Sequence, residues 1–155
     1  LGKSINIDEK SGAIKFSSNI LFDQNEYKLK EESKKELSIV LKKYLNTLVG
    51  DKEMRKFIES ITIEGHTNSD GTYLSNLALS QQRALAVMQF LYDSNIIDKD
   101  LLSTYVNSSG RSSSDLILDK TGAEDKDASR RIEIKFAIKN EEAVKELQNF
   151  LGDKK

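Results

Sequence analysis

Two neighbouring stretches decide the fold of this chain: IEGHTNSDG at residues 63–71 and NLALSQQRA at residues 76–84. The first starts with alternating apolar and polar residues and ends in a polar loop bounded by Gly71, so it predicts a strand that runs into a loop. The second predicts a helix with Ser80 as its N-cap, which places Arg83 in the first helical turn. Cations are disfavoured at that end of the helix dipole. An arginine beside unpaired backbone N–H groups therefore indicates an anion site, with a carboxylate or phosphate as the expected ligand.

Composition and charge exclude several classes of protein. The 155 residues are 37% hydrophobic, which is enough for one buried core. Because 24 Lys and Arg residues balance 25 Asp and Glu residues, the basic excess of a nucleic-acid-binding module is missing, and we expect no nucleic-acid partner. The sequence has no apolar run of about 20 residues that would predict a membrane span, and no cysteine for disulfides or thiolate metal sites. A start at Leu1 without Met predicts a domain of a longer protein, whose membrane segment would lie upstream.

Apolar periodicity predicts an α+β fold. We expect strands near residues 14–22, 61–65, 101–109 and 131–138, and helices near residues 33–50, 52–59, 80–95 and 141–151. The order β-α-β-α-β-β predicts a two-layer sandwich with helices on one face of a mixed four-stranded sheet, followed by an extra C-terminal helix. Residues 1–13 are expected to form a short strand or an ordered lead-in, residues 14–138 the domain and residues 139–155 the C-terminal helix. The polar residues 108–127 predict a long loop.

Three blocks of the sequence resemble the OmpA C-terminal-like family, which includes MotB-type stator proteins and Pal-type lipoproteins. The main block is GHTxxxG at residues 65–71 with NxxLSxxRA at residues 76–84. ILFDQN at residues 20–25 is similar to the end of the family's opening strand, and RRIEI at residues 130–134 is similar to its closing strand. The blocks follow the family's order over residues 14 to 136, and the resemblance implies the family's fold.

The resemblance also implies a noncatalytic grip on the diaminopimelate residue of the peptidoglycan stem peptide. The family's Arg maps onto Arg83, which would hold a carboxylate, whereas its Asp maps onto Asn68, which carries no charge for the ligand's ammonium. Asp70 is the candidate to supply the missing carboxylate, since alternate residues of an extended loop share a face. The other ligand-binding candidates are Thr67, Asn76, Leu79, Ser80, Asn25 and Arg131. No catalytic residue, metal or cofactor is implied.

Other roles for these residues stay open from the sequence. Arg83 could form an ion pair with Asp70 or Glu64 in place of a ligand. Ser80, His66 and Asp70 can be written as a hydrolytic triad, but Ser80 is expected to cap a helix, and no GxSxG motif surrounds it. His66 shows no metal-ligand spacing. Of the pair at residues 130 and 131, one arginine is expected to point into the site while the other faces away.

The preferred function is therefore noncovalent binding of peptidoglycan in the periplasm, which would anchor a membrane protein such as a MotB-like stator. A lipoprotein or a porin is also compatible as the parent protein, and a homodimer is possible. The alternative is a protein-interaction or assembly module that keeps the fold but has weak or no wall binding because of Asn68. A wall hydrolase is the least favoured reading.

Overall fold

The computed structural model describes residues 5–152 and contains one five-stranded sheet in the order β1-β2-β5-β3-β4. The strands are β1 (Ile5–Ile7), β2 (Ile14–Ser17), β3 (Ile58–His66), β4 (Val106–Gly110) and β5 (Arg131–Ile138). Neighbouring strands pair antiparallel except β3 and β4, which are parallel. The α+β class and the mixed sheet are confirmed, but the expected number of four strands is wrong. Part of the expected lead-in forms β1, which pairs with β2 and adds an edge strand; residues 1–4 and 153–155 lie outside the described residues.

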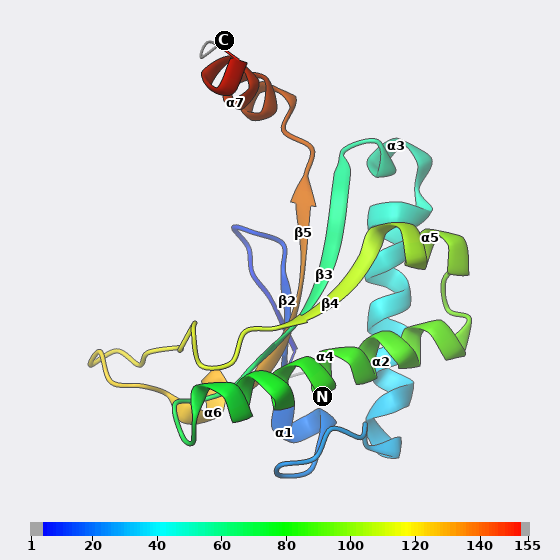
Figure 1. Ribbon diagram of the computed structural model, residues 1–155. Helices are drawn as coiled ribbons and strands as arrows, with labels where there is room; N and C mark the ends of the chain where they lie inside the picture. The colour runs from blue at the N-terminus through cyan, green and yellow to red at the C-terminus, as the bar shows by residue number, and fades with distance from the viewer. Residues whose placement is uncertain (1–4, 153–155) are drawn as a thin grey trace.

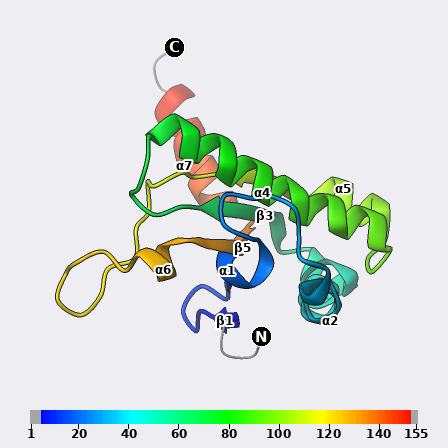
Figure 2. The same cartoon turned by 90° about the horizontal axis from the view of Figure 1, so that it is seen from below.

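Two long helices cover one face of the sheet. Figures 1 and 2 show α2 and α4 on the same side, whereas α7 stands beyond the far end of β5. The helices are α1 (Ser18–Leu21), α2 (Glu31–Leu45) with a π-helical extension η1 (Asn46–Gly50), α3 (Lys52–Arg55), α4 (Tyr73–Ser94), α5 (Lys99–Tyr105), α6 (Lys126–Ser129) and α7 (Glu141–Gly152). Within residues 5–152, no helix combines the length and the apolar character that crossing a membrane requires.

The core lies between these two helices and the sheet. Alternate residues of each strand face the helices, as a period of two requires. The fully buried core side chains include Leu37, Leu41 and Leu45 of α2, Ala84, Val87 and Leu91 of α4, and Ile14, Phe16, Ile61, Ile63, Ile132 and Ile134 of the strands. The opposite face of the sheet carries polar side chains, so one sheet separates an apolar layer from a charged one.

Two glycines allow α4 to lie directly on the sheet. A Cβ atom on Gly65 would be 2.1 Å from the Ser80 carbonyl oxygen, and one on Gly110 would be 2.5 Å from Ser80 Oγ. The side chain of Ser80 also accepts a hydrogen bond from the backbone N–H of Ser112 at 3.1 Å. This close approach fixes the middle of α4 over the ends of β3 and β4, and with it the position of Arg83 one turn later.

The expected start of α4 at Ser80 is wrong. The helix begins two turns earlier, where the Thr72 hydroxyl accepts a hydrogen bond from the Ser75 backbone N–H at 3.2 Å. Residues 73–79 contain neither glycine nor proline, so nothing interrupts the helix before Ser80. Arg83 therefore lies in the interior of α4, and the helix N-terminus does not explain an anion site there.

Four other segments differ from the expected elements. The helix expected near residues 52–59 ends at Arg55, and β3 already begins at Ile58. The first part of the expected strand at residues 101–109 is helix α5, because Asp98 Oδ1 accepts hydrogen bonds from the N–H groups of Asp100 and Leu101 and starts a helix. Residues 18–21, expected to continue a strand, form α1, and α6 begins within the expected loop. The expected strand over residues 131–138 and the C-terminal helix are confirmed.

Candidate functional site

A polar pocket of about 290 Å³ opens at the end of β3, where the 67–72 loop and α4 meet the segment after α1. Seven of the nine residues that the sequence proposes as ligand-binding line this pocket: Asn25, Thr67, Asn68, Asp70, Asn76, Leu79 and Arg83. Asn25 is far in the sequence from the other six, which lie within residues 67–83. Ser80 and Arg131 lie outside the pocket.

Arg83 is the buried cation of the pocket, with a residue exposure of 5%. Its Nε donates to the Glu26 carbonyl oxygen at 2.8 Å and its Nη2 to the Asp23 carbonyl oxygen at 3.3 Å. The guanidinium also stacks on Phe22, with 5.1 Å from Cζ to the ring centroid. Among the described residues, no carboxylate lies within 4.0 Å of it, so its positive charge is held by backbone dipoles and an aromatic ring alone.

A second arginine adds to this positive charge. Arg130 lines the same pocket, and burial, with the charge of Arg130 as a further cause, lowers the pKa of Arg83. Arginine stays protonated in proteins, so Arg83 remains charged. The lowered pKa reports the free-energy cost of burying this charge. A bound carboxylate would offset that cost, because it would pair with a guanidinium that has none.

The other proposed partners of Arg83 are engaged elsewhere. Asp70 accepts from Lys126 Nζ at 2.7 Å, and Glu64 accepts from Lys135 Nζ at 3.0 Å. The interpretation of Arg83 as the partner of Asp70 or Glu64 is therefore wrong, and the pocket keeps an unmatched cation.

The acidic wall of the pocket is built by the loop after β3. Asn68 is buried, and its Oδ1 accepts the backbone N–H of Asp70 at 2.9 Å, which closes an Asx turn. Asn76 Nδ2 donates to the Asp70 carbonyl oxygen at 2.7 Å and holds the loop against α4. The Asp70 carboxylate lines the pocket and is 64% exposed, so it can receive a cation from solvent.

Ser80 and Arg131 take structural positions. The Ser80 hydroxyl donates to the Leu77 carbonyl oxygen at 2.9 Å and is fully buried between α4 and β4. Arg131 was expected in the site, but it points to the opposite face of the sheet, where its Nε donates to Glu133 Oε2 at 2.5 Å. Arg130, its neighbour in the chain, lines the pocket instead, because successive residues at a strand start face opposite ways.

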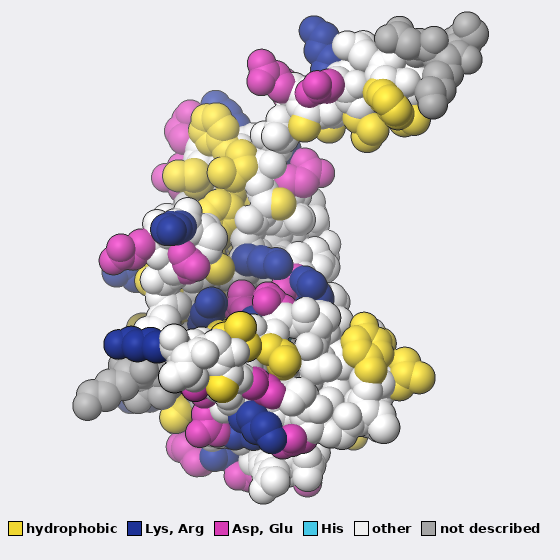
Figure 3. Space-filling view, turned by 90° about the vertical axis from the view of Figure 1, so that its left-hand side faces the viewer, with side chains coloured by type: hydrophobic (Ala, Val, Ile, Leu, Met, Phe, Trp, Pro, Cys, Tyr) yellow, Lys and Arg dark blue, Asp and Glu magenta, His cyan; other side chains and the backbone are white. Residues whose placement is uncertain are grey.

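A buried ionic network covers the polar face of the sheet. His66 Nε2 lies 3.2 Å from Glu64 Oε1 and 3.7 Å from Glu133 Oε2, and Arg131 bridges Glu133 and Asp115. Figure 3 looks onto this side of the molecule, where acidic and basic side chains mix. His66, Asp115 and Glu133 lie close enough together to hold a metal ion, but Arg131 already supplies the positive charge between the two carboxylates. His66 pairs with Glu64 on the face opposite Ser80, so the three residues of the hydrolytic alternative do not converge.

The segment after β4 supports the pocket loop, which the sequence did not indicate. Glu124 accepts from the Ser69 backbone N–H at 3.0 Å and from its hydroxyl, and Lys126 pairs with Asp70. The Asp70 carboxylate raises the pKa of Lys126, as expected for a paired lysine. The polar character of the segment was visible in the sequence, but its contact partners lie about 55 residues away and have no local signal.

Comparison with known proteins gives the family and the fold. The model of the OmpA family matches residues 21–131. Zorya protein ZorB of Escherichia coli strain Crooks is 34% identical over 152 residues, which cover 91% of this chain and 63% of that protein. The chain thus spans less than two thirds of the length of this relative.

Solved structures with similar folds come from cell-envelope proteins. The cell wall anchor of the T6SS from Pseudomonas aeruginosa superposes with a TM-score of 0.62 at 19% identity, covering 89% of this chain and 90% of that one. The periplasmic domain of Helicobacter pylori MotB has a TM-score of 0.65 at 17% identity, covering 97% of this chain and 90% of that one. At these identities the likeness concerns the fold alone.

Proposed function

The chain belongs to the OmpA family, and on that premise we propose that its pocket binds peptidoglycan noncovalently through the diaminopimelate residue of the stem peptide. The observation that carries the proposal is the buried Arg83 guanidinium, which opens into a polar pocket and has no carboxylate partner among residues 5–152. A planar guanidinium fork suits a carboxylate, and charge-assisted hydrogen bonds are the strong ones.

The ligand's ammonium is assigned to the opposite wall. Asp70 is the carboxylate that lines the pocket at the position nearest to Asn68, and its pairing with Lys126 shows that it accepts an ammonium. The bound ligand would take the place of Lys126 or share Asp70 with it. In this arrangement, Arg83 and Asp70 hold the two charged ends of one zwitterionic group.

The proposed biological role follows from noncovalent binding of this zwitterionic group. We propose a periplasmic domain that tethers a membrane-associated protein to the cell wall without catalysis. Support comes from the fold shared with the periplasmic domain of MotB and with a solved cell wall anchor. The absence of chemistry is proposed because Ser80 is committed to buried backbone contacts and His66 to Glu64.

The direct test is co-sedimentation with purified sacculi that contain diaminopimelate. We expect Arg83→Gln to weaken binding by about tenfold or more, because a charged hydrogen bond contributes about 1.5–3 kcal/mol. Arg55→Gln is the matched control, since Arg55 also donates to backbone carbonyls but lies on α3, away from the pocket. Sacculi with lysine at the same stem position should bind weakly, since lysine lacks the second carboxylate. Equal binding of wild type and Arg83→Gln would refute the proposal.

The alternative function is a protein-interaction module with weakened wall binding. One observation favours it: the Oδ1 of Asn68, where the resemblance implies an Asp, is already occupied by the Asp70 N–H. A folded wild-type domain that does not sediment with any sacculi, while Asn68→Asp does, would support this alternative.

A further inference from the structure

A lysine of this chain already occupies the acidic wall of the pocket. Lys126, the first residue of α6, donates from Nζ to Asp70 Oδ1 at 2.7 Å. Figure 1 shows α6 beside the loop that joins β3 to α4. The tip of Lys126 is a primary ammonium, which is the same chemical group as the ligand amine assigned to Asp70 above. A side chain of the protein therefore lies where the ligand's ammonium would bind.

The backbone that carries Lys126 is held in place. Just before it, Glu124 accepts from the Ser69 N–H at 3.0 Å, and the Asp125 N–H donates to the Ile117 carbonyl oxygen at 2.8 Å. The Asp125 side chain also caps α6. The flexible side chain of Lys126 is 53% exposed, so it can turn into water while its backbone stays at the pocket. A competitor attached in this way is never diluted and acts at a constant effective concentration.

The charges around Asp70 favour displacement of Lys126 over sharing. Asp70 raises the pKa of Lys126, and the positive charge of Arg130 acts against this rise. A ligand ammonium bound beside Lys126 would add another positive charge around one carboxylate, and release of Lys126 removes that repulsion. The release costs little, because the side chains of Lys126 and Asp70 are 53% and 64% exposed and exposed ion pairs contribute little to stability.

We propose that Lys126 competes with the ligand's ammonium for Asp70, and that it sets how strongly the pocket prefers a free ligand amine to an acylated one. This inference rests on the proposed function, since it concerns the same ligand. A ligand with a free ammonium has to displace Lys126 before it gains the ion pair with Asp70. A ligand whose amine is bound in an amide carries no such charge, so it leaves Lys126 in place and is held through Arg83. Lys126 therefore reduces the advantage of the free amine.

Isothermal titration calorimetry with two soluble probes tests the competition. One probe is the tripeptide of L-alanine, γ-linked D-glutamate and meso-diaminopimelate, and the other is the same tripeptide with its side-chain amine acetylated. The measured quantity is the ratio of the two affinities, free amine over acetylated amine. We expect Lys126→Gln to raise this ratio by about two- to fivefold, because the competing cation is lost.

Two further variants control for charge. Lys126→Arg keeps a cation for Asp70 and should keep the wild-type ratio. Lys56→Gln removes the same charge from an exposed ion pair with Glu53 at 3.2 Å, outside the pocket, and should also leave the ratio unchanged. A ratio that rises equally in Lys56→Gln would show a general effect of net charge and would overturn the proposal.

Repeating the substitution in an Asp70→Asn background separates competition from a structural role of Lys126. Without the carboxylate there is nothing to compete for, so Lys126→Gln should then leave the ratio unaltered. A rise in both backgrounds would refute competition. An unchanged ratio in the wild-type background, with binding that still requires Arg83, would overturn this inference and leave the proposed function standing. If no variant binds either tripeptide, the proposed function fails and this inference fails with it.

Acylation of Lys126 by acetic anhydride, followed by mass spectrometry, measures the displacement directly. The neighbouring carboxylate favours the protonated amine, which does not react. We expect a saturating amount of the free-amine tripeptide to speed the acylation of Lys126, whereas the acetylated tripeptide should not. An acylation rate that stays the same or falls when the free-amine tripeptide binds would show that Lys126 keeps Asp70, which contradicts the proposal.

Discussion

Single residues on the polar face of the sheet set how stability depends on pH. Burial alone would raise the pKa of Glu64, but hydrogen bonds from His66 and Lys135 outweigh it and lower this pKa to about 2. In the unfolded chain the same carboxyl titrates near 4.5. The stabilisation is therefore complete above pH 4.5 and is lost as the pH falls toward 2.

We predict that the free energy of unfolding falls between pH 5 and pH 2 by about 2–3 kcal/mol more in wild type than in Glu64→Gln. Urea unfolding followed by circular dichroism at several pH values measures the difference. Parallel pH profiles for the two proteins would show that Glu64 contributes no such linkage. Exposed Glu53, whose ion pair with Lys56 lies on the surface, provides the control variant Glu53→Gln.

Asn68 stands where the resemblance to the family implies an aspartate, and a substitution tests this position. Asn68→Asp keeps an oxygen to accept the Asp70 N–H and adds a charge at the wall of the pocket. On the proposed function, affinity for diaminopimelate-containing sacculi rises by about tenfold, because the ligand's ammonium gains a charged acceptor. Asp70→Asn should lower affinity by a similar factor. If Asp70→Asn binds like wild type, the ammonium is held elsewhere.

Individual residues also show how much of the candidate site could be predicted from the sequence. Seven pocket residues could be named because they belong to a spaced motif, but the choice between Arg130 and Arg131 depends on where β5 starts. A shift of one residue exchanges the two faces of a strand, and no local pattern sets that start to a single residue. The backbone partners of Arg83, the Asp23 and Glu26 carbonyls, belong to a loop whose path has no sequence signal.

At the scale of elements, the contact between α4 and β3 is the one that we expect a substitution to disturb most. We predict that Gly65→Ala lowers the free energy of unfolding by about 2–3 kcal/mol or more, because a Cβ would meet the Ser80 carbonyl oxygen at 2.1 Å and push α4 from the sheet. Denaturant unfolding measures the change. Gly152→Ala serves as the control, since a Cβ there meets nothing within 4 Å. An unchanged midpoint for Gly65→Ala would mean that α4 can shift without loss of packing.

Elements with strict periodicity were predictable, and those fixed by caps were less so. The alternation of Ile132, Ile134 and Phe136 located β5, and the stripe from Leu37 to Leu48 located α2. The start of α4 was misplaced because residues 72–76, which include Thr72, Ser75 and Asn76, fit a loop as well as an exposed first turn. In the structure, the Thr72 cap starts the helix at Tyr73. The Ser112 hydroxyl, from a distant segment, donates to the Tyr73 carbonyl oxygen and holds this first turn in place.

For the whole molecule, the body and α7 are expected to be energetically separate in the monomer. We predict that removing residues 141–155 changes the free energy of unfolding of the dilute protein by less than about 0.5 kcal/mol, since no described residue of α7 is buried. Sacculus binding should also persist. Thermal unfolding at low micromolar concentration provides the measurement, and a marked loss of stability would show that α7 packs on its own body.

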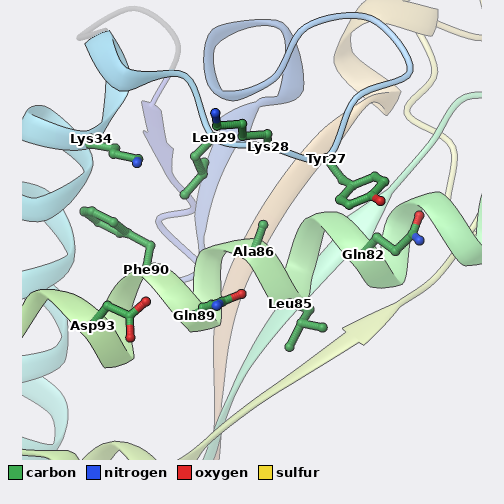
Figure 4. Close-up of a pocket in the computed structure, with 10 residues that line it drawn as sticks. All are labelled: Tyr27, Lys28, Leu29, Lys34, Gln82, Leu85, Ala86, Gln89, Phe90 and Asp93. Carbon is green, nitrogen blue, oxygen red and sulfur yellow. The ribbon is translucent and has the colours of Figure 1, made fainter.

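Residues 22–29 form a wall with two sides: Asp23 and Asn25 line the pocket, whereas Tyr27 and Leu29 line a separate groove of about 540 Å³ against α4 (Figure 4). Arg83 of α4 donates hydrogen bonds to two backbone carbonyls of this wall, so a segment fixed to α4 bounds both the pocket and the groove. A ligand in either hollow therefore contacts the same segment. Any coupling between ligands in the two hollows is therefore reciprocal: the factor by which a groove ligand changes wall-peptide affinity equals the factor by which the wall peptide changes groove-ligand affinity.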